Sequence, residues 1–150
     1  PEAGDLIAVI GLLDLHGLPL KFPRARDPAN ARCDWAKQEL ERRVDRPEFH
    51  QFFAVHELEA WLLSQPALFG GLAAKAVAKI AREPERVNDK TPPAKFLNTA
   101  YEKETGRGYK KTTNGVALFA KLDPAIAAEK CPHLKAMLET MLDLAKAKGL

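Results

Sequence analysis

The chain has 150 residues, of which 46% are hydrophobic and 29% charged, with a formal net charge of +3. These values are typical of a soluble protein with one domain, and so mild a positive charge is weak evidence for nucleic-acid binding. No apolar run approaches the roughly 20 residues that cross a bilayer, and no signal peptide is visible. Cys33 and Cys131 have no CxxC partner, which argues against a zinc ribbon or a disulfide framework, so we expect a cytoplasmic location.

The first predicted element is a strand. Residues 6–13 contain almost no polar group, a pattern typical of a strand buried on both faces. After a loop, an amphipathic helix is predicted over 28–44, and the aromatic run 49–55 predicts a second strand. A fully buried strand needs neighbours on both sides. Because only two strands are predicted, we expect the chain to be the C-terminal part of a longer protein, or the missing strands to come from a partner chain.

The remainder of the chain is predicted to be mainly helical, especially from about residue 66. There are no internal repeats, no low-complexity tract and no linker, so we expect a single domain over residues 1–150. Loops are predicted over 83–93 and 106–113. Helices are predicted over residues 57–64, 72–82, 93–104, 114–122, 124–129 and 132–147.

Carboxylates follow both predicted strands. Asp14 closes the first strand, and Glu57 and Glu59 come directly after the second. Active sites of open α/β sheets lie at the carboxyl ends of the strands, and carboxylate oxygens suit Mg²⁺. The alternatives are structural: Asp14 also fits a turn aspartate that caps the following loop, and acids near a helix start are favoured by the helix dipole.

His56 lies beside these acids. If a helix begins near His56, then His56 and Glu59 share a face at a spacing of three residues. The segment is not the HExxH zinc-protease pattern, because Ala60 stands where the second histidine would be. We therefore interpret His56 as a hydrogen-bonding partner that orients a carboxylate, rather than as a metal ligand.

Basic residues gather later in the chain. Lys103, Arg107, Lys110 and Lys111 fall within nine positions and would neutralise nucleic-acid phosphates, with Tyr109 stacking on a base. A solvated surface loop explains the same residues, and the residues alone favour it.

Three smaller features have a functional and a structural interpretation. Lys95, near a helix start, would contact a phosphate, although most exposed lysines have no such role. Asn88 and Asp89 would reach a metal or cap the next helix, and capping is favoured. Cys131-Pro132-His133 is closer to a helix start than to a nucleophile site. A Walker loop, a dinucleotide fingerprint and a GxSxG elbow are absent from the sequence.

Taken in order, five blocks of the chain resemble the bacterial family called domain of unknown function 4276. The first fits the pattern D-x-x-G-L-P-x-x-F-P, and the others fit H-E-[FL]-E-A followed by Ser-x-Pro, N-D…P-[SA]-K, Y-x-K…G and C-P-H-[FL]. In this chain the blocks are Asp14–Pro19 with Phe22-Pro23, His56–Ala60 with Ser64-Gln65-Pro66, Asn88-Asp89 with Pro93-Ala94-Lys95, Tyr109–Lys111 with Gly115, and Cys131–Leu134. Together they span nearly the whole chain.

This resemblance implies a TOPRIM-like fold, found beside ATPases in bacterial defence-type gene clusters. In such folds one strand supplies a glutamate and a later strand supplies an Asp-x-Asp pair, which together bind Mg²⁺ for phosphodiester chemistry. Asp14 matches the first aspartate of that pair. His16 stands in place of the second aspartate, and the glutamate strand is not in this chain, so Glu57 and Glu59 would replace the lost acid. The implied fold class is α/β, a few-stranded, mostly parallel sheet flanked by many helices.

The expected function is metal-dependent cleavage of nucleic acid. Asp14 and Glu59 would hold Mg²⁺ or Mn²⁺, and Glu57 would be a second metal contact or orient the water. His56 would orient a carboxylate or carry a proton. The residues expected to position the substrate backbone are Lys95, Lys110 and Lys111. The alternative is a non-catalytic adaptor that binds a partner ATPase, and assembly of several copies of the chain is compatible with either function.

Overall fold

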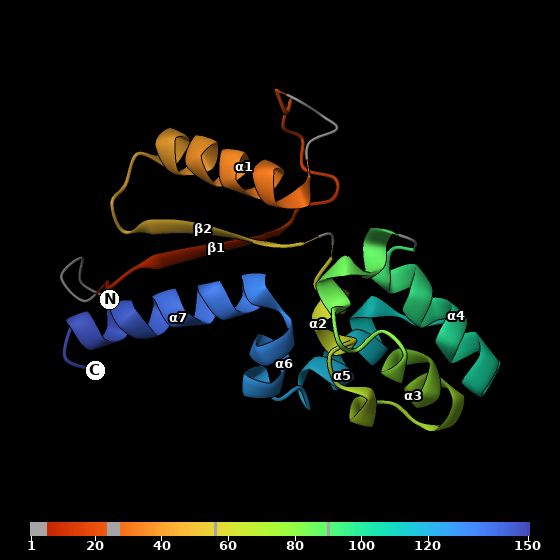
Figure 1. The fold of residues 1–150 in the computed structure, drawn as a ribbon. Helices are drawn as coiled ribbons and strands as arrows, with labels where there is room; N and C mark the ends of the chain where they lie inside the picture. The colour runs from red at the N-terminus through yellow and green to blue at the C-terminus, as the bar shows by residue number, and fades with distance from the viewer. Residues whose placement is uncertain (1–5, 24–27, 56, 90) are drawn as a thin grey trace.

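The computed structural model describes residues 6–23, 28–55, 57–89 and 91–150. Its sheet consists of two parallel strands, β1 (Val9–Asp14) and β2 (Phe49–Ala54), aligned from Val9 opposite Phe49 to Asp14 opposite Ala54. Helix α1 (Ala29–Val44) connects them. Figure 1 shows α1 on one face of the sheet and α7 (Pro132–Ala147) on the other. The two predicted strands and the helix between them are confirmed within a few residues.

Strand β2 lies at the centre of the core because helices cover both of its faces. Its side chains alternate between the two layers, as the strand geometry requires. Phe52 packs with Leu134 and Met137 of α7, whereas Phe53 packs with Cys33 and Ala36 of α1. The last four residues of β2 are all buried. This double burial explains why the segment has no polar alternation in the sequence.

The prediction that the first strand is fully buried is wrong for this chain. Val9 is 44% exposed and Leu13 is 43% exposed. Helices α1 and α7 pack mainly over β2, and β2 is the one strand that pairs with β1 among the described residues. The amides of Val9 and Leu15 donate to carbonyls next to or within β2. By the two-residue period of a strand, the backbone groups of Ile10 and Leu12 therefore face the open edge.

The other helices form a second layer of packing beyond the carboxyl ends of the strands (Figure 1). They surround a core that includes Leu62, Val77, Leu97 and Leu118. The described part of the chain contains seven α-helices, two 3₁₀ segments and one π-helical turn. Besides α1 and α7, these are α2 (Glu59–Leu62), η1 (Pro66–Leu68), α3 (Gly71–Ala78), η2 (Pro84–Asp89), α4 (Pro93–Thr105), η3 (Lys111–Gly115), α5 (Val116–Phe119) and α6 (Pro124–Lys130).

Three predicted helices are shorter in the structure. The helix expected over 114–122 is limited to α5, because its first two residues belong to the π-helical turn η3. The helix expected over 57–64 is reduced to the single turn α2. At its end the Ser64 hydroxyl donates to the carbonyl of Trp61, and Pro66 follows two residues later. The helix expected over 72–82 ends at Ala78, and Pro84 opens η2 soon after. By contrast α6 begins as predicted, with Asp123 Oδ1 accepting hydrogen bonds from the amides of its first turn. None of the helices in the described part of the chain is both long and apolar enough to cross a membrane.

Candidate functional site

The carboxyl ends of β1 and β2 bring the predicted acids together. Asp14 is the last residue of β1, and its Oδ1 accepts a hydrogen bond of 3.0 Å from the amide of Leu58. This contact ties the segment that leaves β2 to the end of β1. Since Glu57 and Glu59 flank Leu58 in the sequence, the same contact brings both glutamates close to Asp14. The predicted gathering of acids at this edge is present in the structure.

Glu59 is the most deeply buried of the three acids. It is the first residue of α2 and only 4% exposed. Its Oε2 lies 3.2 Å from Lys111 Nζ, and its Oε1 accepts a long hydrogen bond of 3.4 Å from the Tyr109 hydroxyl. A buried carboxylate is costly without such partners. Lys111 and Tyr109 therefore supply the opposite charge and the hydrogen bond that compensate for the burial of this carboxyl group.

Glu57 has two roles in the structure. Its Oε2 accepts a hydrogen bond of 2.8 Å from the amide of Ala94, which lies in the first turn of α4. Its Oε1 lies 3.7 Å from Lys111 Nζ. The carboxylate thus caps a helix, as the structural interpretation of these acids predicts, and also shares Lys111 with Glu59. Capping occupies one carboxylate oxygen, so the other remains available to a cation.

The environment of this acid cluster (Asp14, Glu57 and Glu59) shifts the pKa values of Asp14 and Lys111. Burial raises the pKa of Asp14, and the charges of Glu59 and Glu57 add to this, against the opposing effects of the Leu58 amide and Lys111. Partial burial alone would lower the pKa of Lys111. Its hydrogen bond to Glu59 and the charges of all three acids outweigh that effect and raise it. Lys111 is therefore a firmly protonated cation inside the cluster.

Asp14→Asn is expected to raise the thermal stability of the chain at pH 7. A folded-state pKa above the ordinary 3.8 means that the Asp14 contribution to stability is full below pH 3.8 and is lost as the pH rises through the folded pKa. Asparagine stays neutral and can still accept from the Leu58 amide. Melting temperatures at pH 3 and pH 7 check this: the variant should exceed the parent only at pH 7. A variant that melts below the parent at pH 7 would show that attraction to Lys111 outweighs burial. Asp143→Asn, at an exposed position on α7, is the control.

One short segment supplies both partners of Glu59. Lys110 has an extended backbone, so the side chains of Tyr109 and Lys111 point to the same side, as residues two apart do in a strand. The π-helical turn Lys111–Gly115 follows, and the Gly115 amide donates to the carbonyl of Lys110. A Cβ at Gly115 would lie 2.6 Å from the Tyr109 hydroxyl, so glycine is needed there. The Tyr-x-Lys spacing was the sequence signal for this arrangement. The sequence instead predicts that Lys111 positions the substrate backbone, with base stacking by Tyr109 and a solvated loop as open alternatives.

The remaining predicted residues lie around the cluster or outside the description. Lys110 is exposed and, with Arg107, lines a cavity of about 390 Å³ beside the π-helical turn. Lys95 is exposed in the first turn of α4, next to the amide that binds Glu57. His56 lies outside the described residues, as do the side chains of Asn88 and Asp89.

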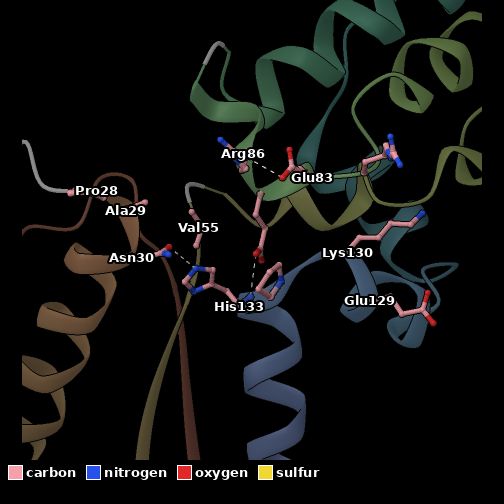
Figure 2. Close-up of a pocket in the computed structure, with 12 residues that line it drawn as sticks. Pro28, Ala29, Asn30, Val55, Glu83, Arg86, Glu129, Lys130 and His133 are labelled. Carbon is pink, nitrogen blue, oxygen red and sulfur yellow. Dashed lines mark hydrogen bonds and ion pairs between the residues drawn. The ribbon is translucent and has the colours of Figure 1, made fainter.

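A separate cavity of about 500 Å³ lies between the starts of α1 and α7, and none of the three acids lines it (Figure 2). Beneath it the buried Glu85 accepts hydrogen bonds from Trp61 Nε1 and from the amide of His133, and so caps α7. The His133 ring contacts Asn30 Oδ1 at 3.1 Å. Burial raises the pKa of the Cys131 thiol to about 12, which leaves it protonated near neutral pH. The Cys131-Pro132-His133 block is therefore a helix start, in line with the interpretation favoured from the sequence.

The acid cluster fits a divalent metal ion in its chemistry and position, but not in its present arrangement. Its six carboxylate oxygens are hard donors of the kind that Mg²⁺ and Mn²⁺ prefer, at the carboxyl edge of a parallel sheet. Across the described ranges, no three Asp, Glu, His or Cys side chains are arranged to hold a metal ion as they stand. In the same place the Lys111 ammonium lies against Glu57 and Glu59. A monovalent cation thus already stands where a metal ion would bind.

The family model of the domain of unknown function DUF4276 matches residues 4–142 of the chain. Comparison with curated proteins and with solved structures gave no match.

Proposed function

We propose a function for this chain, which belongs to the family called domain of unknown function 4276. It is a TOPRIM-like nuclease that hydrolyses nucleic-acid phosphodiester bonds with a divalent metal ion. The observation that supports this most is that Glu57 and Glu59 share one cation, Lys111, beside Asp14 at the carboxyl edge of a parallel sheet. By its resemblance to TOPRIM-like proteins, we further propose that it acts in a bacterial defence system beside an ATPase.

Each acid has a distinct role in this proposal. Asp14 and Glu59 would hold Mg²⁺ or Mn²⁺. Glu57 would keep α4 in place through Oε2 and offer Oε1 as a second metal contact or as an acceptor for water. When bound, the metal ion would polarise the phosphate and lower the pKa of the attacking water. The carboxylates cannot do this alone, because they repel the anionic phosphate.

Cations near the cluster would bind the substrate backbone. Lys110 and Arg107 line the cavity beside the π-helical turn, and Lys95 is exposed at the start of α4. The Lys111 side chain is 54% exposed although its ammonium contacts the acids. These side chains surround the cluster with positive charge that the phosphates of a strand need. The proposal therefore places Lys95 and Lys110 on phosphates flanking the bond that is cleaved.

The test is a cleavage assay on the full chain, with plasmid DNA and single-stranded RNA as separate substrates, each with Mg²⁺ or Mn²⁺. We expect cleavage of one of the two substrates that is lost in Asp14→Asn and retained in Asp143→Asn. The adaptor function replaces the nuclease function if two results are found together. The parent cleaves neither substrate, and the parent and Asp14→Asn bind a partner ATPase equally well.

A further inference from the structure

We propose that Lys111 is a built-in cation that occupies the acid cluster until a divalent metal ion binds, and that it then transfers to a phosphate oxygen of the substrate. This inference rests on the proposed function and adds a regulatory exchange to the same site.

The carboxylate oxygens are divided between permanent and exchangeable partners. Backbone amides donate hydrogen bonds to Asp14 Oδ1 and Glu57 Oε2, and the Tyr109 hydroxyl donates one to Glu59 Oε1. Lys111 Nζ lies against the two other glutamate oxygens, 3.7 Å from Glu57 Oε1 and 3.2 Å from Glu59 Oε2. In the proposed site a metal ion would bind these two oxygens together with the second oxygen of Asp14. The ammonium therefore occupies the metal-binding face of the cluster, while the other face is fixed by the fold.

The backbone of Lys111 is fixed, whereas its ammonium group can move. The backbone is held by the π-helical turn and by the hydrogen bond from the Lys110 amide to Asn114 Oδ1. π-Helical turns are found frequently at functional sites. The side chain, in contrast, is a flexible four-carbon stem that is 54% exposed. Rotation about that stem can carry Nζ from the glutamates toward solvent without disturbing Tyr109 or Gly115.

Charge balance favours exchange over coexistence on the same oxygens. With all three acids ionised, the cluster and Lys111 together carry a formal charge of −2. A divalent ion neutralises this charge fully when Lys111 stays nearby, but it cannot share Glu59 Oε2 with an ammonium group because the two cations repel at contact distance. The displaced Lys111 then lies beside the metal ion, where a bound phosphate supplies the negative charge it has lost. Without metal, Lys111 keeps the buried Glu59 paired.

The test measures Mn²⁺ affinity by calorimetry on the full chain, comparing the parent with Lys111→Met and Lys110→Met. Methionine keeps an apolar stem and removes the charge. We expect Lys111→Met to bind Mn²⁺ about 10-fold more tightly than the parent. The metal ion then no longer has to displace an ammonium group that makes a charge-assisted hydrogen bond to Glu59. Lys110→Met, at the exposed neighbouring position, should bind like the parent. Lys111→Met should nevertheless lose cleavage, a combination that a purely structural role would not give.

Two further measurements test the exchange of Lys111 for a metal ion. Lys111→Arg retains the charge, and its planar guanidinium can bind a carboxylate through two hydrogen bonds, so this variant should bind Mn²⁺ more weakly than the parent. This comparison does not depend on whether Lys111→Met folds. Titration with Mg²⁺ should move the NMR signal of the Lys111 ammonium. Unchanged or weaker Mn²⁺ binding in Lys111→Met, with binding in the parent intact, would overturn the exchange alone. No Mn²⁺ binding in the parent or in any variant would overturn the proposed metal site and the exchange with it.

Discussion

Glu59→Gln is expected to weaken Mn²⁺ binding at least about 100-fold. Loss of an indirect partner of a metal ligand typically costs 10- to 100-fold in affinity, so loss of a charged ligand should cost no less. The substitution keeps the size of the side chain, and its amide oxygen can still accept from Tyr109 or Lys111. Glu59 is nearly fully buried, so water should not reach its position to replace the lost ligand. Calorimetry on parent and variant measures the effect.

Glu139→Gln is a suitable control for the Glu59 variant. Glu139 lies on α7 and forms an exposed ion pair with Lys135, of a kind that contributes little to stability. Its Mn²⁺ affinity should equal that of the parent. If Glu59→Gln binds Mn²⁺ as tightly as Glu139→Gln does, then Glu59 is a structural partner of Lys111 and not a metal ligand.

Leu97→Ala is expected to lower the free energy of unfolding by about 3 kcal/mol, within the range of roughly 2–5 kcal/mol for a core leucine truncated to alanine. Leu97 is fully buried and packs α4 within the core around Leu62, Val77 and Leu118. Most domains have only about 5–15 kcal/mol of stability, so this is a large fraction. Urea denaturation of parent and variant gives the difference.

The effect of Leu97→Ala should extend to the acid cluster. The first turn of α4 carries the Ala94 amide that binds Glu57, so loosening α4 also loosens that carboxylate. Leu72→Ala is the matched control, because Leu72 is 56% exposed and its loss should change the free energy of unfolding by less than about 0.5 kcal/mol. A loss below 1 kcal/mol for Leu97→Ala would show that this core relaxes around the cavity.

The local sequence largely determined where strands and helices lie. The apolar and aromatic runs became β1 and β2, and α7 spans the predicted residues 132–147 because its apolar spacing and Pro132 agree. The acids after the two strands could also be predicted to meet, since parallel strands end at one edge of a sheet. These features depend on neighbours within a few residues, or on one rule of sheet geometry.

Only the tertiary structure decided which partners those acids have. Lys111 lies 52 positions from Glu59 in the chain, and the Ala94 amide lies 37 positions from Glu57, so no local pattern could pair them. The exposure of β1 was decided in the same way. A run of apolar residues shows that a strand can be buried, but which strand is covered depends on where α1 and α7 pack, and here they pack over β2. Local periodicity fixes an element, whereas long-range packing fixes which of its side chains meet and which remain open to solvent.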